Sequence, residues 1–354
     1  MKTRRLFYED VYIQEFEAIV LSCEEKDGKY HVILNATAFY PEGGGQPADK
    51  GMLDNIPVVD VQYIDGELCH IMESPLEEGA QVVGKIDWNW RFDLMQQHSG
   101  EHIVSGMIHE KYGYENVGFH MGEEIITIDL SGMLTWQQVQ EIEKKVNYYI
   151  WMNQQVNIFY PDERQRKFIP YRSKKELTGE IRLVEFPGAD LCACCGLHVT
   201  HASQIGLVKI LSCKKFRDGV RMEMLSGKRA LDYLSGSTEQ NSQIAVSLSV
   251  KENETKEAVQ RLLDEVYDLK GQLAQEKQKS FEAKAASFAG KGNVLLIEDT
   301  MEVAEVRKCT DSILNTCGGI AALFAGNDTD GYKYAIGERN GDIKELVKKV
   351  NKEL

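Results

Sequence analysis

Two short segments of the chain carry side chains that bind transition metals. Residues 98–102 read His-Ser-Gly-Glu-His, so His98 and His102 are four residues apart and, on a helix, reach one ion from the same face. Residues 194–198 read Cys-Cys-Gly-Leu-His and place Cys194 and His198 at the same spacing. Thiolate and imidazole are ligands that zinc prefers. We therefore predict one zinc ion (Zn2+) per chain, held by these two pairs of side chains.

The second segment leaves the ligand set open. Cys192, Cys195 and His201 are competing ligands by residue type alone. Cys192 and Cys195 also form a C-x-x-C pair, which suits redox chemistry, but no thioredoxin-like βαβ pattern surrounds them. The metal interpretation is therefore favoured over the redox interpretation.

The first segment also fits a different class of enzyme. It matches H-x-x-E-H, the motif of an inverted type of zinc peptidase. In that alternative Glu101 is the base, and Glu176 or Glu180 supplies a third ligand. This interpretation gives no role to the cysteine–histidine pair or to the glycine-rich segment described next, so it is the weaker one.

A third segment, residues 37–51, is rich in glycine. Three consecutive glycines, among them Gly44 and Gly45, permit positive φ angles and a close approach of the backbone to a ligand. Thr37 and Gln46 bracket the run with a hydroxyl and an amide. A glycine-rich hairpin turn explains the same pattern, so this segment gains weight only beside the metal pairs.

Basic side chains gather in two places although the chain carries a net charge of −14. Residues 161–175 hold six basic against two acidic residues, and residues 207–229 hold seven against two. The seven are Lys209, Lys214, Lys215, Arg217, Arg221, Lys228 and Arg229. We predict that Lys214, Lys215, Arg217 and Arg221 contact phosphates, the alternative for each being an ordinary solvated charge.

The local patterns predict an α+β fold in four segments. Residues 1–90 form a small β-barrel that carries the glycine-rich loop, and residues 91–232 form a zinc-containing α+β domain. Residues 233–290 form a helical linker, and residues 291–354 form a small α/β module. Within the first segment, β-rich runs separated by turn residues lie at 17–21, 30–34, 58–63 and 81–86.

Capping signals locate the helices of the second segment. Apolar spacing predicts a helix over residues 91–111 that ends at Gly113, and Thr135 begins a second helix with a capping box. On the first helix the residues expected on or near one face are Leu94, His98, Ile103, Met107 and Ile108.

The linker carries an apolar stripe with alternating spacings of three and four. Its members are Val259, Leu262, Val266, Leu269 and Leu273. A single helix cannot bury such a seam alone. We expect a second helix of the chain or a second subunit to cover it, and we favour a homodimer through residues 252–354.

The length and composition limit the class of protein. The chain has 354 residues, 43% hydrophobic and 27% charged, which is ordinary for globular domains. No apolar run approaches the ~18 residues of a membrane helix, and the basic first residues are followed by Glu9 and Asp10, unlike a signal peptide. We therefore expect no membrane partner and a cytoplasmic protein.

Taken in order, these motifs resemble the editing domain of alanyl-tRNA synthetases and the free-standing AlaX trans-editing proteins. The matching stretches are 37–51, 98–102, 194–198, 204–206 and 219–221, within residues 1–230. Residues 233–354 are similar, more loosely, to the C-terminal part of the synthetases, as in long-form AlaX proteins. The combination of motifs is specific, whereas each motif alone is common.

The resemblance implies hydrolysis of the ester that joins a wrong amino acid, serine or glycine, to the alanine tRNA. An alanine-sized pocket rejects serine poorly, so a second hydrolytic site is needed. The resemblance assigns Thr37 to recognition of the serine hydroxyl, and Gln46, with Gly44 and Gly45, to orientation of the ester or water. A tRNA-binding protein with a purely structural zinc is a further alternative.

Two departures from the family pattern stand out. Leu197 occupies the position before the last histidine, where the family has threonine or proline. The sequence ends at Leu354 without the glycine-rich segment of the synthetases, which weakens the expectation that the last module contacts tRNA.

Overall fold

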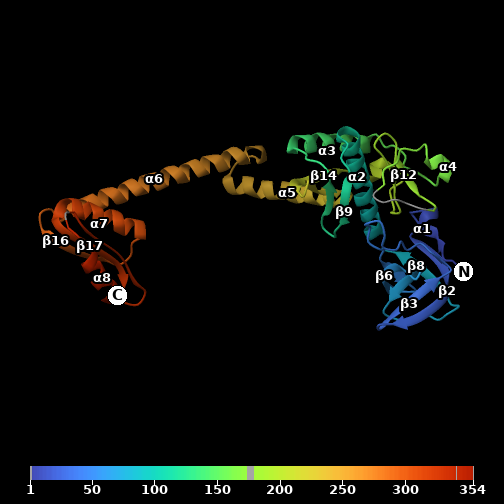
Figure 1. Ribbon diagram of the computed structural model, residues 1–354, viewed down its shortest axis with the longest axis horizontal. Helices are drawn as coiled ribbons and strands as arrows, with labels where there is room; N and C mark the ends of the chain where they lie inside the picture. The colour runs from blue at the N-terminus through green and yellow to red at the C-terminus, as the bar shows by residue number, and fades with distance from the viewer. Residues whose placement is uncertain (1, 174–178, 340, 354) are drawn as a thin grey trace. The chain divides into compact units, whose positions relative to one another are not determined.

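The structure is a computed structural model that describes residues 2–173, 179–339 and 341–353. The chain divides into two units, Met1–Glu239 and Gln240–Leu354. The boundary falls within helix α5 (Gly227–Leu248), labelled in Figure 1. Helices and β-sheet occur in both units, so the mixed α and β composition predicted from the sequence is confirmed.

The first unit begins with six antiparallel strands that pair in a closed ring, in the order β2-β3-β7-β6-β5-β8. They are β2 (Glu15–Lys26), β3 (Lys29–Leu34), β5 (Gly51–Leu53), β6 (Ile56–Ile64), β7 (Glu67–Met72) and β8 (Gln81–Ile86). Phe16, Ala18 and Val20 alternate inward along β2 and are buried. Two short strands, β1 (Arg4–Arg5) and β4 (Ala36–Thr37), pair beside the ring, with helix α1 (Leu6–Glu9) between them in the chain.

Helix α2 (Trp88–Tyr112) is the central element of this unit. Asp87 caps its N-terminus by accepting from Trp90 N at 3.1 Å, and Gly113 ends it with φ 71°. The predicted helix is confirmed, and its burial extends beyond the expected face, because every residue from Leu94 to Gly106 is buried. The helix contacts α3, β9, β13, β15 and η1, so each of its faces meets another element.

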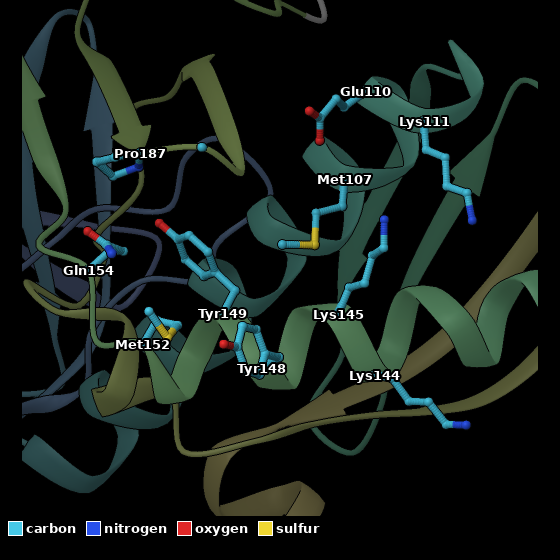
Figure 2. Close-up of a pocket in the computed structure, with 11 residues that line it drawn as sticks. Met107, Glu110, Lys111, Lys144, Lys145, Tyr148, Tyr149, Met152, Gln154 and Pro187 are labelled. Atoms are coloured by element: carbon cyan, nitrogen blue, oxygen red, sulfur yellow. The ribbon is translucent and has the colours of Figure 1, made fainter.

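Two sheets and a second helix surround α2. The larger sheet has the order β14-β15-β10-β9, and the smaller has the order β11-β12-β13. Helix α3 (Trp136–Trp151) begins at the predicted Thr135–Gln138 capping box and packs against α2 (Figure 2). The strands are β9 (Asn116–Met121), β10 (Ile126–Leu130), β11 (Asn157–Phe159), β12 (Leu183–Phe186), β13 (Asp190–Ala193), β14 (Val208–Phe216) and β15 (Gly219–Ser226), with the short helices α4 (Glu163–Arg166) and η1 (Ala202–Ile205).

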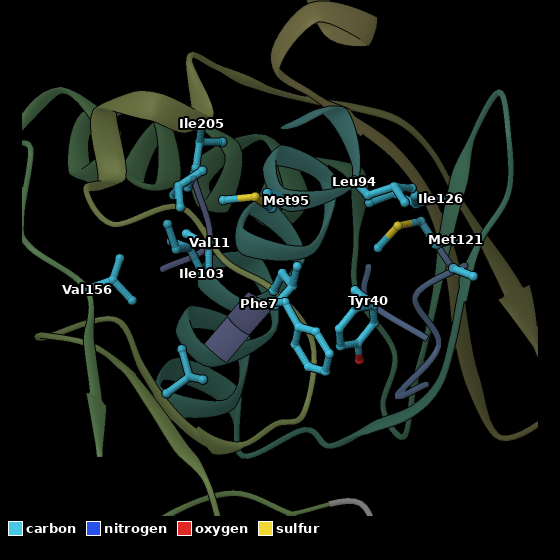
Figure 3. Close-up of a cluster of buried hydrophobic side chains, with 14 of the residues drawn as sticks. Phe7, Val11, Tyr40, Leu94, Met95, Ile103, Met121, Ile126, Val156 and Ile205 are labelled. Atoms are coloured by element: carbon cyan, nitrogen blue, oxygen red, sulfur yellow. The ribbon is translucent and has the colours of Figure 1, made fainter. Parts of the chain in front are cut away.

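One hydrophobic core joins the barrel to the α2 region. Figure 3 shows Phe7 and Tyr40, from the barrel segment, beside Leu94 and Ile103 of α2. All four side chains are at most 2% exposed. The glycine-rich loop and the metal-type side chains are therefore held by the same packed core.

The second unit has its own small core. Its sheet has the order β16-β17-β18, with β16 parallel and β18 antiparallel to β17. Phe281 and Ala285 of α6 pack with Ile313 and Leu323. The elements are η2 (Glu252–Glu254), α6 (Thr255–Ser287), β16 (Gly292–Glu298), α7 (Val303–Cys317), β17 (Gly318–Asn327), β18 (Gly331–Glu338) and α8 (Lys344–Glu353).

The apolar stripe of the linker lies on α6 and is exposed. Its five members, Val259 to Leu273, have relative exposures between 40% and 56%. Among the described residues, no helix is both long and apolar enough to cross a membrane.

Candidate metal centre

The two pairs of metal-type side chains meet at one point. The sulfur of Cys194 lies 3.5 Å from Nε2 of His98 and 3.4 Å from Nε2 of His198. With one ligand atom of His102, these atoms lie within 4.8 Å of one another, and all four residues are buried. Ligand lengths of ~2.3 Å for sulfur and ~2.05 Å for nitrogen place S and N about 3.6 Å apart around a tetrahedral zinc ion. The cluster can therefore hold a metal ion, and its spacing is consistent with zinc.

Each histidine of the cluster has a partner on its outer nitrogen. These contacts are His98 Nδ1 to Gln46 Oε1 at 3.0 Å, His102 Nδ1 to Asp190 Oδ2 at 2.8 Å, and His198 Nδ1 to Ser99 Oγ at 3.2 Å. A hydrogen bond at Nδ1 fixes the ring and leaves Nε2 free for an ion. This arrangement is typical of histidines that bind metal.

Glycines make the cluster sterically feasible. A Cβ on Gly106, four residues after His102, would lie 2.3 Å from the carbonyl oxygen of Ala189. The bare helix surface there lets β13 approach, and β13 begins with Asp190, the partner of His102. A Cβ on Gly196 would lie 2.1 Å from His98 Cε1, so the turn between the cysteine and the last histidine also needs glycine.

Backbone contacts hold the turn that carries Cys194. The amide of Gly196 donates to the Cys194 sulfur at 3.3 Å. The guanidinium of Arg182 donates to the carbonyl oxygens of Cys194 and Gly196, both at 2.9 Å. Arg182 is itself only 6% exposed and stacks on the ring of Tyr8. Contacts other than metal ligation therefore hold the turn in place.

Electrostatics distinguish Cys194 from its neighbours. Burial opposes its ionisation, but the coulombic effect of the three histidines outweighs burial and lowers the pKa of Cys194 well below its usual range. Burial raises the pKa of Cys192 to about 11, and burial also raises the pKa of Cys195. Among the three thiols, Cys194 is the one suited to bind as a thiolate.

The competing ligands lie outside the four-residue cluster. Cys195 is exposed, and Cys192 groups instead with His102 and Asp190. His201 lies next to the turn, where its Nδ1 contacts the hydroxyl of Thr200 at 3.3 Å.

A cavity of about 630 Å³ borders the cluster. Ligand sites commonly have volumes of ~300–1,000 Å³. Gly44 and Gly45, with φ of 62° and 83°, form part of its wall. The remaining lining residues include His98, Glu101, His102, Phe119, Arg172, Glu180, Arg182, Cys192, Cys194 and Cys195. The glycine-rich loop and the metal-type cluster thus face the same space.

Thr37 and Gln46 lie deeper than the sequence suggests. The Thr37 hydroxyl contacts His70 Nε2 at 2.8 Å and accepts from Phe39 N at 3.1 Å, and Thr37 does not line the cavity. Gln46 Oε1 faces His98 Nδ1 and accepts from Leu197 N at 3.0 Å. Gln46 therefore supports a histidine of the cluster, and the amide of the unusual Leu197 helps to hold it.

The carboxylate of the alternative peptidase motif is already engaged. Glu101 lines the cavity, but its Oε1 accepts from Ser105 Oγ at 2.6 Å and from Asn116 Nδ2. Glu180 lines the cavity outside the four-residue cluster, and Glu176 lies outside the described residues.

The basic residues predicted to contact phosphates fall into two groups. Arg221 makes a bidentate ion pair with Asp129, with distances of 2.6 and 2.8 Å, and it stacks on Phe216. Lys214, Lys215 and Arg217 lie on the β14–β15 hairpin and make no ion pair with another described residue. Lys209, Lys228 and Arg229 pair with Glu143, Asp232 and Asp93.

Sequence reasoning missed the residues that support the cluster. Asp190 and Arg182 contact a ligand or its turn but belong to no recognisable motif, and Ser99 lies inside the 98–102 segment without a predicted role. Asp190 is 88 residues from His102, so only the fold brings the two together. Arg172 completes this chain of contacts by donating to Asp190 Oδ1 at 2.7 Å.

Two family models match parts of the chain. The family model of class II (A) tRNA synthetases matches residues 5–90. The model of the threonyl and alanyl tRNA synthetase second additional domain matches residues 181–222, which include Arg182, Asp190, Cys194 and His198.

Curated relatives cover most of the sequence. The chain is 33% identical over 270 residues to alanyl-tRNA editing protein Aarsd1-B of Xenopus laevis, an alignment that covers 72% of this chain and 66% of the relative. It is 31% identical over 242 residues to alanyl-tRNA editing protein AlaX-L of Pyrococcus horikoshii, covering 65% of this chain and 60% of the relative. It is 31% identical to the alanine–tRNA ligase of Pyrobaculum aerophilum, covering 100% of this chain and 44% of the relative. The chain thus spans 66% or less of the length of these three proteins.

Proposed function

Because the chain is a homologue of the alanyl-tRNA editing proteins and of alanine–tRNA ligases, we propose that it is an aminoacyl-tRNA deacylase that acts on mischarged alanine tRNA. The bond it cleaves is the ester between the tRNA and a wrong amino acid, serine or glycine. The observation that carries this proposal is the buried His98, His102, Cys194 and His198 cluster at the wall of a cavity that the glycine-rich loop also borders.

The proposed ion is one zinc per chain, bound by those four residues. Four protein ligands are typical of a closed tetrahedral site, in which zinc would shape the protein around it. If one ligand gave way to water or substrate, zinc would supply Lewis-acid chemistry toward the ester. The protein's own part is to hold three rings through Gln46, Asp190 and Ser99, so that every Nε2 is aligned beforehand.

Glycine-loop residues are proposed to place the ester. The positive φ angles of Gly44 and Gly45 bring bare backbone to the cavity wall, where the substrate carbonyl can approach closely. Gln46 holds His98 through its carbonyl oxygen, while its Nε2 is buried without a hydrogen-bond partner among the described residues. An amide donor in that position can donate to a substrate oxygen or to a water, but cannot remove a proton.

Serine recognition by Thr37 remains part of the proposal. Burial lowers the pKa of His70 to about 4, so the Thr37 hydroxyl contacts a neutral imidazole. Contact with a serine hydroxyl would require Thr37 to share or exchange that partner. A hydrogen bond between the Thr37 hydroxyl and the serine hydroxyl would favour serine. Alanine has no hydroxyl and would leave the Thr37 side without that partner.

The β14–β15 hairpin is the proposed contact for tRNA phosphates. Lys214, Lys215 and Arg217 support this role because they make no ion pair with another described residue, whereas the predicted role of Arg221 competes with its ion pair to Asp129. Charge reversal of Lys214 and Lys215 should weaken tRNA binding and flatten its dependence on salt, measured by filter binding.

We also propose a homodimer through residues 252–354. The support is the exposure of Val259, Leu262, Val266, Leu269 and Leu273 at helical spacing along α6. Such a seam gains stability when it packs against a second copy of itself.

The test of the proposed activity is a substrate panel. Purified protein is incubated with seryl-, glycyl- and alanyl-tRNA(Ala) and, separately, with a peptide library. We expect rapid release of serine, slow release of alanine and no peptide cleavage. Cleavage of peptides alone would favour the zinc peptidase, and tight tRNA binding without release of any amino acid would favour a non-catalytic tRNA-binding protein.

A further inference from the structure

A second pocket lies between helices α2 and α3, with a volume of about 530 Å³. Figure 2 shows Met107 of α2 and the ring of Tyr149 of α3 between the two helices. None of its lining residues lines the cavity beside the metal-type cluster. The proposed chemistry therefore does not explain this pocket.

The wall of this pocket is rich in lysine. Lys111, Lys144 and Lys145 line it, and the acidic lining residue is Glu110. Lys111 pairs with Glu141 at 2.9 Å, but Lys144 and Lys145 make no ion pair with another described residue. In a chain with a net charge of −14, two such neighbouring lysines form a local positive site.

Aromatic side chains interleave with these lysines on the exposed face of α3. Lys144, Tyr148 and Trp151 follow one another at spacings of four and three, so they lie along the same face of the helix. Tyr148 is 62% exposed and Trp151 is 72% exposed. The buried face of α3 is formed by other residues, such as Val139 and Val146, so packing of α3 does not need these rings.

A buried donor completes the site. Tyr149 lines the pocket at 8% exposure, and no described residue accepts a hydrogen bond from its hydroxyl. Burial raises the pKa of Tyr149, so the hydroxyl keeps its proton and remains a donor. The pocket thus offers ammonium groups, aromatic faces and an unused hydroxyl to one ligand.

We propose that this α2–α3 surface, defined by Lys144, Lys145, Tyr148, Tyr149 and Trp151, is a second RNA-binding site that holds the phosphate backbone and a stacked base of the tRNA substrate. Lysines neutralise phosphates, and exposed aromatic rings stack on bases irrespective of sequence. The inference rests on the proposed function for the identity of the RNA. It adds a contact remote in sequence from the β14–β15 hairpin.

The test measures binding of uncharged tRNA(Ala) by the full chain at several salt concentrations. The variant Lys144→Glu/Lys145→Glu should bind about tenfold or more weakly, and the slope of log affinity against log salt should flatten by about 1.8. The charge-matched control, Lys26→Glu/Lys29→Glu on the β2–β3 turn, should bind as the unaltered protein does. The conservative variant Lys144→Arg/Lys145→Arg should retain binding, which separates a charge contact from damage to α3.

A small substrate separates this proposal from the proposed function. Hydrolysis of 3′-O-seryl-adenosine, which lacks the tRNA body, should be the same for Lys144→Glu/Lys145→Glu and the unaltered protein. Unchanged tRNA affinity and salt slope in that variant would overturn the RNA site. If the unaltered protein hydrolyses neither seryl-adenosine nor seryl-tRNA(Ala), the proposed function fails, while the binding result still decides the RNA site.

Discussion

Helices α2 and α6 both carry side chains at helical spacing, four residues between His98 and His102 and three or four along the apolar stripe of α6, yet their surroundings are opposite. Every residue of α2 from Leu94 to Gly106 is buried, and its two metal-type histidines each have a partner on the outer nitrogen. Along the 33 residues of α6, the buried residues are Ala258, Phe281 and Ala285. Helical spacing therefore tells which side chains share a face, whereas the rest of the fold decides whether that face is covered.

The largest expected effect is loss of the ion from the α2 centre. Cys194→Ala removes the thiolate that the three histidines surround, so metal content should fall from about one per chain to near zero and deacylation by about 100-fold or more. Metal analysis by mass spectrometry checks this. Cys195→Ala is the matched control and should keep its zinc; if it loses zinc while Cys194→Ala retains it, the ligand assignment is wrong.

A smaller effect on zinc binding is expected from Asp190, which contacts the ligand His102 rather than the ion itself. Asp190→Asn keeps the shape but removes the charge that holds His102 and pairs with Arg172, so zinc affinity should fall about 10- to 100-fold. Competition with a chelator of known affinity measures it. Asp218→Asn, in the β14–β15 turn, is the control. Equal zinc affinities in the two variants would mean that the contact with Asp190 does not help His102 to bind the ion. The surroundings of α2 would then not account for its difference from α6.

Thr37 tests selectivity rather than metal binding. Thr37→Val keeps the volume and removes the hydroxyl, so discrimination between seryl- and alanyl-tRNA(Ala) should fall by about 1–3 kcal/mol while zinc content is unchanged. Relative deacylation rates on the two substrates give the answer. If the ratio stays the same, the contact of Thr37 with His70 is purely structural, and the cavity residues must select serine.

The smallest effect on catalysis is expected from α6. Val266→Glu/Leu269→Glu places charges in the exposed seam and should convert the dimer to a monomer, with deacylation of seryl-adenosine changed by less than about twofold. Light scattering measures the mass, and Lys270→Glu on the same helix is the control. If the unaltered protein is a monomer, the proposed homodimer is wrong. The apolar stripe of α6 would then share only its helical spacing with the histidines of α2.

The sequence predicted the local features well and the long-range ones poorly. The two metal pairs, the Thr135 capping box and the Gly113 helix end each depend on residues within a few positions of one another, and the structure places them as expected. Asp190 and Ser99 could not be identified, because their roles arise from contacts across 88 and 99 residues.

The sequence pattern also could not predict which side chains are buried or which strands pair. The ion pair of Arg221 with Asp129 could not be predicted, because only the pairing of β10 with β15 places Asp129 opposite it. The short strand β5 and the strand β7 were not predicted, since three residues and a stretch containing His70 and Cys69 give no clear alternation. Burial on every side of α2 could not be predicted, because polar residues such as Gln97 and Ser99 are buried there through hydrogen bonds.

The most direct test of the account is deacylation of seryl-tRNA(Ala) by protein from which metal has been removed and then restored. Chelator-treated protein should lose hydrolysis, and one equivalent of zinc should restore both the metal content and the rate, because the four buried side chains on α2 and the Cys194 turn form a single site. Hydrolysis at an unchanged rate by protein shown to be free of metal would contradict the central claim that this cluster underlies the activity.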